Sequence, residues 1–192
     1  SSGSSWRETI VTVDDSLATV PDTIQIFSRN RTEFQYVVRD ATIRNARRIG
    51  VLAHGGRSWV SNNTFTGLGG GAMEGWPDPV EGLCLTSCRF EHNTLVDTNQ
   101  LARVAAPIWL VTFDEPGTLC HTDILIANNT FDVGPGSTFL LSSAADVLIT
   151  DNNITHCLLD LSPVLSTSNT ANITYTSTNN VTYTLAPSKC LK

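Results

Sequence analysis

The 192-residue chain is 41% hydrophobic and 16% charged, a length and composition that suit one domain with a sizeable core. Its formal net charge of −6 argues against a nucleic-acid-binding protein, because such proteins present clustered lysine and arginine side chains to the phosphates. No apolar run approaches the roughly 20 residues that a membrane-spanning helix requires, so we expect no transmembrane segment.

Short apolar segments, bounded by glycine, proline, asparagine or aspartate, follow one another along the chain. Such segments are typical of β-strands, and no window of about 11 residues holds a convincing helical period. In chain order the predicted strand segments are 36–43 (YVVRDATI), 49–54 (IGVLAH), 60–67 (VSNNTFTG), 70–76 (GGAMEGW), 91–97 (EHNTLVD), 106–113 (APIWLVTF), 126–133 (IANNTFDV), 137–143 (STFLLSS) and 149–156 (ITDNNITH). The sequence therefore predicts an all-β protein.

Four of these segments carry an asparagine at an equivalent position, with an apolar residue two places later. The asparagines are Asn63, Asn93, Asn129 and Asn152, at intervals of 30, 36 and 23 residues. A repeated unit of this size cannot bury its apolar face alone, whereas stacked units share one core. We therefore predict a right-handed parallel β-helix of about six coils, with long loops on one face and an asparagine ladder in one turn. An antiparallel β-sandwich is the alternative, which the recurring asparagine register disfavours.

The regularity of the repeats divides the chain into three parts. Residues 35–160 are predicted to form the regular coils, and 161–192 a C-terminal coil and cap. Residues 1–34 are expected to supply N-terminal strands, a first coil, or a linker to an upstream part of a longer chain. In that last case an upstream segment or a second chain would complete the β-helix.

The five cysteines fit an oxidising compartment, and none of their spacings is a convincing zinc-binding pattern. Cys84 and Cys120 each lie nine residues before a ladder asparagine, so stacking would place them in one column and allow a disulfide. A Cys157–Cys190 disulfide would tie the C-terminal tail to the stack, which leaves Cys88 unpaired.

Glycosylation sequons are frequent in the chain, which favours a secreted, cell-surface or lysosomal glycoprotein. The predicted acceptor asparagines are Asn30, Asn62, Asn128, Asn153, Asn172 and Asn180.

Residues 35–155 resemble the β-helix glycosidases that remove α-1,3-linked galactose. The residues that carry this resemblance are Arg44–Asn45, Arg48, Gly50–Val51–Leu52, Asn62–Asn63–Thr64–Phe65, Trp76 and Glu81–Gly82. The resemblance implies a right-handed β-helix and a galactoside substrate. Two features depart from the family pattern. Trp76 and Glu81 are farther apart in sequence than the corresponding tryptophan and glutamate of the family usually are. The paired aspartates that precede the Arg-x-Gly coil in the family have no clear counterpart here.

Glycoside hydrolysis usually needs two carboxylates, one of which acts as general acid. We assign the catalytic roles to Glu74 and Glu81, and the role of sugar platform to Trp76, which lies between a glycine and a proline. The other predicted contacts with an oligosaccharide or glycan are Asp78, His54 and Asp114. Trp109, in an apolar run, is expected in the core, and Trp59 is a further stacking candidate.

Two less specific interpretations stay open. In the first, the acids are solvated loop residues of an acidic protein; in the second, the β-helix is a non-catalytic surface, adhesive or assembly module. The acidic residues are too scattered to predict a metal site, and no cofactor motif is present.

Overall fold

The computed structural model describes residues 36–77, 84–99, 106–111, 119–132, 136–157, 164–176 and 180–184. Within these ranges the chain forms seventeen strands and no helix, so the described part contains no helix that could cross a membrane. The predicted N-terminal part, 1–34, lies outside the described residues, as do parts of the predicted C-terminal coil and cap.

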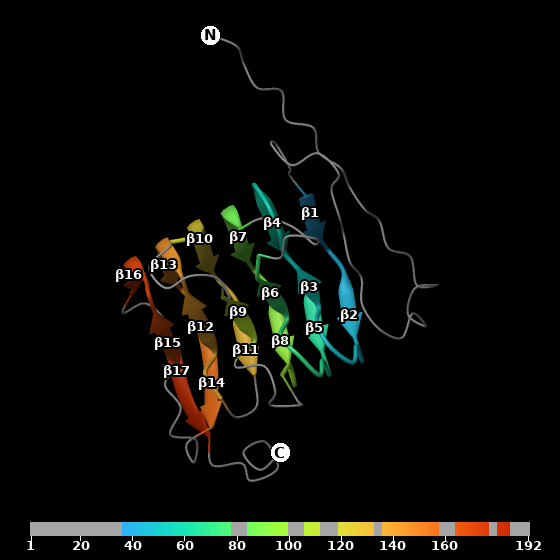
Figure 1. The fold of residues 1–192 in the computed structure, drawn as a ribbon. Coiled ribbons are helices and arrows are strands. Elements are labelled where there is room, and N and C mark those ends of the chain that lie inside the picture. The colour runs from blue at the N-terminus through green and yellow to red at the C-terminus, as the bar shows by residue number, and fades with distance from the viewer. Residues whose placement is uncertain are drawn as a thin grey trace.

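The strands form three parallel sheets that the chain visits in turn (Figure 1). Sheet A contains β1 (Tyr36–Arg39), β4 (Ser58–Ser61), β7 (Thr86–Glu91), β10 (His121–Ala127), β13 (Ala144–Thr150) and β16 (Ala171–Tyr175). Sheet B contains β2 (Thr42–Arg44), β5 (Thr64–Thr66), β8 (Thr94–Val96), β11 (Thr130–Asp132), β14 (Asn153–Cys157) and β17 (Asn180–Thr184). Sheet C contains β3 (Val51–Leu52), β6 (Met73–Gly75), β9 (Ile108–Leu110), β12 (Phe139–Ser142) and β15 (Leu165–Ser168).

One passage through sheets A, B and C makes one coil, and each strand pairs in parallel with its equivalent in the next coil. The predicted fold class, an all-β parallel β-helix, is confirmed. The described residues build five complete coils and the first two strands of a sixth, slightly fewer than the sequence predicted.

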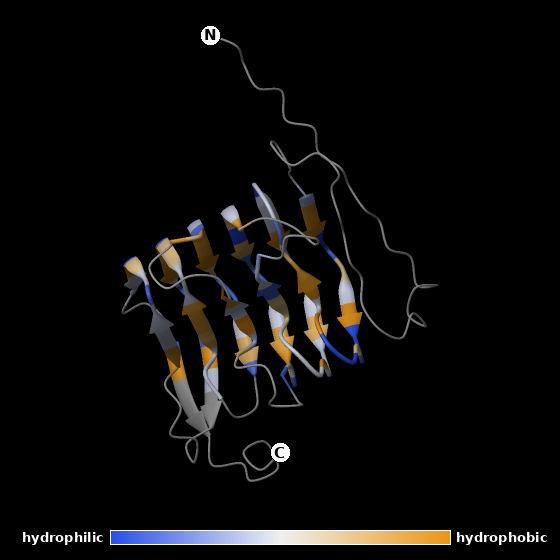
Figure 2. Cartoon of the chain, in the orientation of Figure 1, coloured by the Kyte–Doolittle hydropathy of each residue, from blue (hydrophilic) through white to orange (hydrophobic). Residues whose placement is uncertain are grey.

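The core is a set of apolar columns that run along the inside of the stack. Figure 2 shows hydrophobic residues at equivalent positions in successive strands of the stack. In sheet B the residue two places after each ladder asparagine points inward, and these residues are paired in register from coil to coil. Phe65, Leu95, Phe131 and Ile154 make up this column, and each is 0% exposed. Because neighbouring coils are only about 4.8 Å apart, each side chain packs directly on its equivalents above and below.

The turn between sheets A and B holds the predicted asparagine ladder. Its first residue adopts a left-handed backbone conformation in five successive coils, with φ between 55° and 56°, at Asp40, Asn62, His92, Asn128 and Asp151. Asparagine and aspartate tolerate this conformation better than most residues. The second residue of the turn is the buried ladder asparagine in four of these coils.

Each ladder asparagine satisfies the backbone of the coil before it. The Asn93 side chain accepts a hydrogen bond from the Asn63 backbone N–H at 3.0 Å and donates one to the Val60 carbonyl at 2.9 Å. Its Nδ2 also donates to Oδ1 of Asn129, at 3.0 Å. The first described coil has alanine at this position, and the Ala41 N–H donates to Oδ1 of Asn63.

Candidate functional site

The outer face of sheet C positions Glu74. In β6 the neighbouring Met73 points into the core and is 0% exposed, so Glu74 points outward, as the alternation of a strand requires. Its partners in register are Leu52 on the preceding coil and Trp109 on the following one. Despite its outward direction Glu74 is only 2% exposed.

The glycine run before Glu74 brings the backbone close to its carboxyl group. The Gly71 N–H donates a hydrogen bond to Oε1 of Glu74 at 2.9 Å. A Cβ atom at Gly70 would lie 3.0 Å from the same oxygen and 2.6 Å from the Arg48 carbonyl oxygen, and one at Gly71 would lie 3.1 Å from Cγ of Glu74. The glycines are therefore needed for this close approach.

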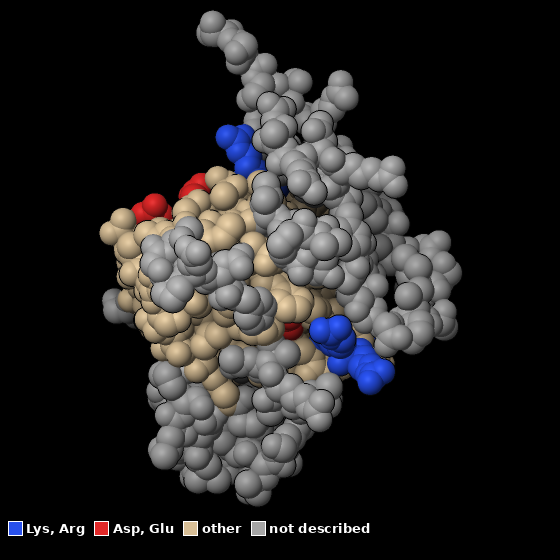
Figure 3. Space-filling model, in the orientation of Figure 1, with Lys and Arg blue, Asp and Glu red and all other residues tan. Residues whose placement is uncertain are grey.

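Burial raises the pKa of the Glu74 carboxyl group from its ordinary value of 4.5 to about 7, although the Gly71 hydrogen bond and the positive charge of Arg48 act in the opposite direction. Figure 3 shows basic side chains beside the turn that joins β2 to β3, the turn to which Arg47 and Arg48 belong. A carboxyl group with this pKa is partly protonated at neutral pH, as a general acid must be.

Two tryptophans lie next to Glu74 on sheet C. Trp76 follows β6, and Trp109 is paired in register with Glu74. Their ring centroids are 6.1 Å apart, with the ring planes inclined by 32°, and both side chains are half-buried. The prediction that Trp109 belongs to the core is wrong, because strand alternation in β9 turns Ile108 and Leu110 inward and Trp109 outward.

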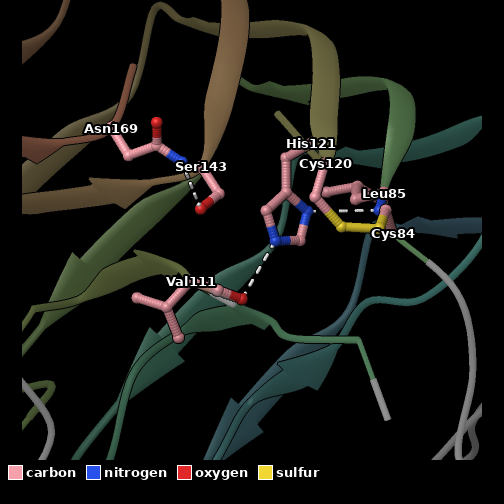
Figure 4. Close-up of a disulfide and its surroundings, with 7 residues drawn as sticks. All are labelled: Cys84, Leu85, Val111, Cys120, His121, Ser143 and Asn169. Atoms are coloured by element: carbon pink, nitrogen blue, oxygen red, sulfur yellow. Dashed lines mark hydrogen bonds between the residues drawn. A yellow bond between two sulfur atoms is a disulfide. The ribbon is translucent and has the colours of Figure 1, made fainter. Parts of the chain in front are cut away.

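A second cluster lies at the corner between sheets C and A, around the Cys84–Cys120 disulfide (Figure 4). The Cα atoms of this predicted disulfide are 5.4 Å apart. Nδ1 of the buried His121 accepts a hydrogen bond from the Leu85 N–H at 3.2 Å, and its Nε2 lies 3.1 Å from the Val111 carbonyl oxygen. Burial is the main cause that lowers the pKa of His121, and the charge of His54 adds to it.

Two histidines of this cluster, His54 and His121, bear on the sequence predictions. His54 follows β3 and is half-buried at the same corner as His121. The sequence did not single out His121, because a lone histidine after a cysteine carries no recognisable pattern. Its two hydrogen-bond partners come from distant segments, and only the stacked coils bring them together.

The structure describes only part of the predicted site. It brings Glu74 and Trp76 together on sheet C, whereas Asp78, Glu81 and Asp114 lie outside the described residues. The role of Glu81 as the second carboxylate stays a prediction. Across the described ranges no group of three histidine, cysteine or acidic side chains is placed to hold a metal ion.

The predicted modification sites are distributed unevenly over the surface. Five predicted acceptors are exposed, and Asn30 lies outside the described residues. The exposed ones are Asn62, Asn128, Asn153, Asn172 and Asn180, and they lie on sheets A and B or at the corner between them.

Cys88 has a buried free thiol, as predicted. Cys190 and the side chain of Cys157 are not among the described parts.

The raised pKa of Glu74 has a measurable consequence for stability. The folded protein favours the protonated carboxyl group, so this contribution is complete below about pH 4.5 and is lost as the pH rises through about 7. We therefore expect Glu74→Gln, which cannot ionise, to be more stable than wild type by about 3 kcal/mol at pH 8 and nearly equal to it at pH 4.

Urea unfolding of both proteins across this pH range checks this expectation. The difference between the two proteins removes the contribution of His121, whose lowered pKa destabilises both as the pH falls below about 6.5. If the free energies of unfolding of the two proteins changed in parallel with pH, Glu74 would not titrate as its burial requires.

Comparison with known proteins places the fold in a family. No curated protein sequence matches the chain. Residues 24–185 match the family described as right-handed beta helix region, which covers well over half of the sequence. The parallel pairing of all three sheets agrees with that match. The chain belongs to the right-handed β-helix family.

Proposed function

We propose that this β-helix processes carbohydrate on the outer face of sheet C, as a glycosidase-like protein with Glu74 as general acid. The observation that carries the proposal is the Glu74 carboxyl group, whose pKa is raised to about 7 beside a pair of partly exposed tryptophans. Aromatic rings offer flat apolar surfaces on which a sugar ring can stack. Glu81 is the proposed second carboxylate, and Asp78, His54 and Asp114 are proposed to contact the sugar.

A galactoside is the most concrete substrate. Two residues that carry the resemblance to the α-1,3-galactosidases have local roles at this site. The positive charge of Arg48 acts on the carboxyl group of Glu74. A Cβ atom at Gly50 would lie 2.7 Å from the Ala72 carbonyl oxygen and 2.8 Å from the Phe65 ring, so this glycine lets the coils pack closely. Both observations are compatible with the resemblance, on which the choice of a galactoside rests.

The surface distribution of sequons is compatible with this site. None of the exposed acceptor asparagines lies on sheet C, so N-linked glycans at those positions would be attached away from the face of Glu74. The sequons and the disulfide together support a secreted, cell-surface or lysosomal glycoprotein.

Hydrolysis of aryl galactosides and of α-1,3-linked galacto-oligosaccharides tests the proposal. We expect kcat/KM to fall as the pH rises above about 7, because a general acid must be protonated. Glu74→Gln should lower kcat/KM by about a hundredfold. Asp146→Asn is the matched control, since it removes an exposed carboxylate on sheet A and should leave hydrolysis unchanged.

A non-catalytic module for adhesion or assembly is the second candidate. The observation in its favour is the low exposure of Glu74, whose Oε1 is also bound to the Gly71 backbone, as in a purely structural carboxyl group. Absence of hydrolysis in wild type, together with a higher stability of Glu74→Gln at pH 8, would favour this candidate. In this second candidate function, an upstream segment or a second chain would extend the stack of coils.

A further inference from the structure

A groove of about 760 Å³ lies on a different face, over the sheet A strands β1, β4, β7 and β10. The residues in its lining that bear on ligand binding are Arg39, Arg57, Trp59, Arg89, Glu91 and Asp123. None of these has a role in the proposed chemistry on sheet C. The groove therefore needs a separate explanation.

The centre of the groove is one row of side chains in register across four coils. Val37 pairs with Trp59, Trp59 with Arg89, and Arg89 with Leu125. Trp59 is 43% exposed, the highest value among the exposed large hydrophobic residues of the described part. Three coil intervals span on the order of 14 Å, which is long enough for a short oligosaccharide.

The charges of the groove differ from those of the chain. Three arginines line it against two acidic residues, whereas the whole chain carries a net charge of −6. Arg39 makes a long ion pair with Asp40, at 3.9 Å, and the Asp123 carboxylate accepts a hydrogen bond from the Ser87 hydroxyl at 2.7 Å. Figure 3 shows basic side chains at the upper ends of β4 and β7, and acidic ones farther along the sheet near β10 and β13.

We propose that this groove binds an acidic oligosaccharide, with Trp59 as the stacking platform and Arg89 as the principal anion contact. A guanidinium group presents paired N–H donors that match a carboxylate or a sulfate. The arginines belong to the coils around Trp59, so an anionic sugar stacked on the indole lies next to them. This proposal does not depend on whether Glu74 is catalytic.

Calorimetric titration of the full chain with three hexasaccharides tests the proposal. The probes are an oligogalacturonate, which offers carboxylates, a heparin fragment, which offers sulfates, and neutral maltohexaose. We expect at least one acidic probe to bind and the neutral one to bind at least tenfold more weakly. Raising the NaCl concentration from 50 to 300 mM should weaken the binding severalfold, because the contacting charges are exposed to solvent.

Variants locate the binding on the groove. Trp59→Ala should weaken binding by roughly tenfold, and Arg89→Glu should abolish it. Leu148→Ala is the matched control, since Leu148 is 38% exposed in the same row of sheet A, one coil beyond Leu125 and outside the groove lining. Glu74→Gln should bind as wild type does, which separates this groove from the proposed active site.

Several results would overturn the proposal: no binding of either acidic probe, equal binding of maltohexaose, or unchanged binding by both groove variants when circular dichroism shows them folded. Binding that is lost in Arg89→Glu but unaffected in Trp59→Ala would indicate general attraction of polyanions, and would also contradict a sugar platform.

Discussion

Replacement of Asn93 with alanine is expected to reduce the free energy of unfolding by about 4 kcal/mol. Oδ1 of Asn93 accepts hydrogen bonds from both the backbone N–H and Nδ2 of Asn63, and Nδ2 of Asn93 donates to the Val60 carbonyl and to Asn129. All four interactions are buried. Alanine would leave the Asn63 N–H and the Val60 carbonyl without these partners, and each unsatisfied buried group costs about 1–3 kcal/mol. Urea unfolding measures the loss.

The neighbouring His92→Asn is the matched control. His92 is exposed and has a φ of 56°, and its column contains asparagine at Asn62 and Asn128. The substitution should change stability by no more than about 0.5 kcal/mol. It creates a sequon, so all variants are produced in a bacterial periplasm, where N-glycans are not added and disulfides form. If Asn93→Ala were as stable as His92→Asn, the asparagine ladder would be a consequence of coil stacking and would not itself stabilise the protein.

The ladder was predictable from the sequence because each coil repeats the same local requirement. The turn between sheets A and B has two residues in each of the five complete coils, so the ladder position and the apolar residue after it keep their spacing even though the coils differ in length. The pattern of Asn63 and Phe65, an asparagine followed two places later by an apolar residue, therefore recurs in later coils. The number of coils was less predictable, because loop lengths between sheets vary and obscure where one coil ends.

The candidate site was only partly predictable, for a physical reason. A strand pattern identifies Glu74 as outward-facing, and an outward position on a strand normally implies exposure to solvent. Its burial depends on neighbours far away in sequence, such as Trp109 in the following coil, and on the close approach of the glycine run at Gly70 and Gly71. The pKa of Glu74 follows from that burial, so no local pattern reveals it.

The groove on sheet A escaped the sequence analysis for a related reason. Trp59 and Arg89 are 30 residues apart in sequence, and only the register of β4 with β7 makes them neighbours. The interval to Leu125 on β10 is different, because the loops of that coil are longer. A row of side chains across coils of unequal length has no fixed spacing that a sequence could display.

Removal of the Cys84–Cys120 disulfide by a double substitution to alanine is expected to cost about 4 kcal/mol of stability. The bond closes a loop with a sequence separation of 36, and its main effect is to restrict the unfolded chain. The folded corner should persist, because His121 still links Leu85 to Val111. We therefore expect an unchanged near-ultraviolet circular dichroism spectrum and a larger dependence of unfolding on urea concentration, since the unfolded chain exposes more surface.

Reduction of the wild type and of the double variant separates this disulfide from any other. A reductant should lower the stability of the wild type to that of the double variant. If it also destabilises the double variant, a second disulfide contributes, and the predicted Cys157–Cys190 pair is the candidate to test by peptide mapping. Cys88 should not react with thiol reagents in the folded protein, because its thiol is buried and its pKa is raised to about 12. A double variant as stable as the oxidised wild type would contradict the loop-closure argument. It would indicate that the hydrogen bonds of His121, and not the disulfide, stabilise this corner.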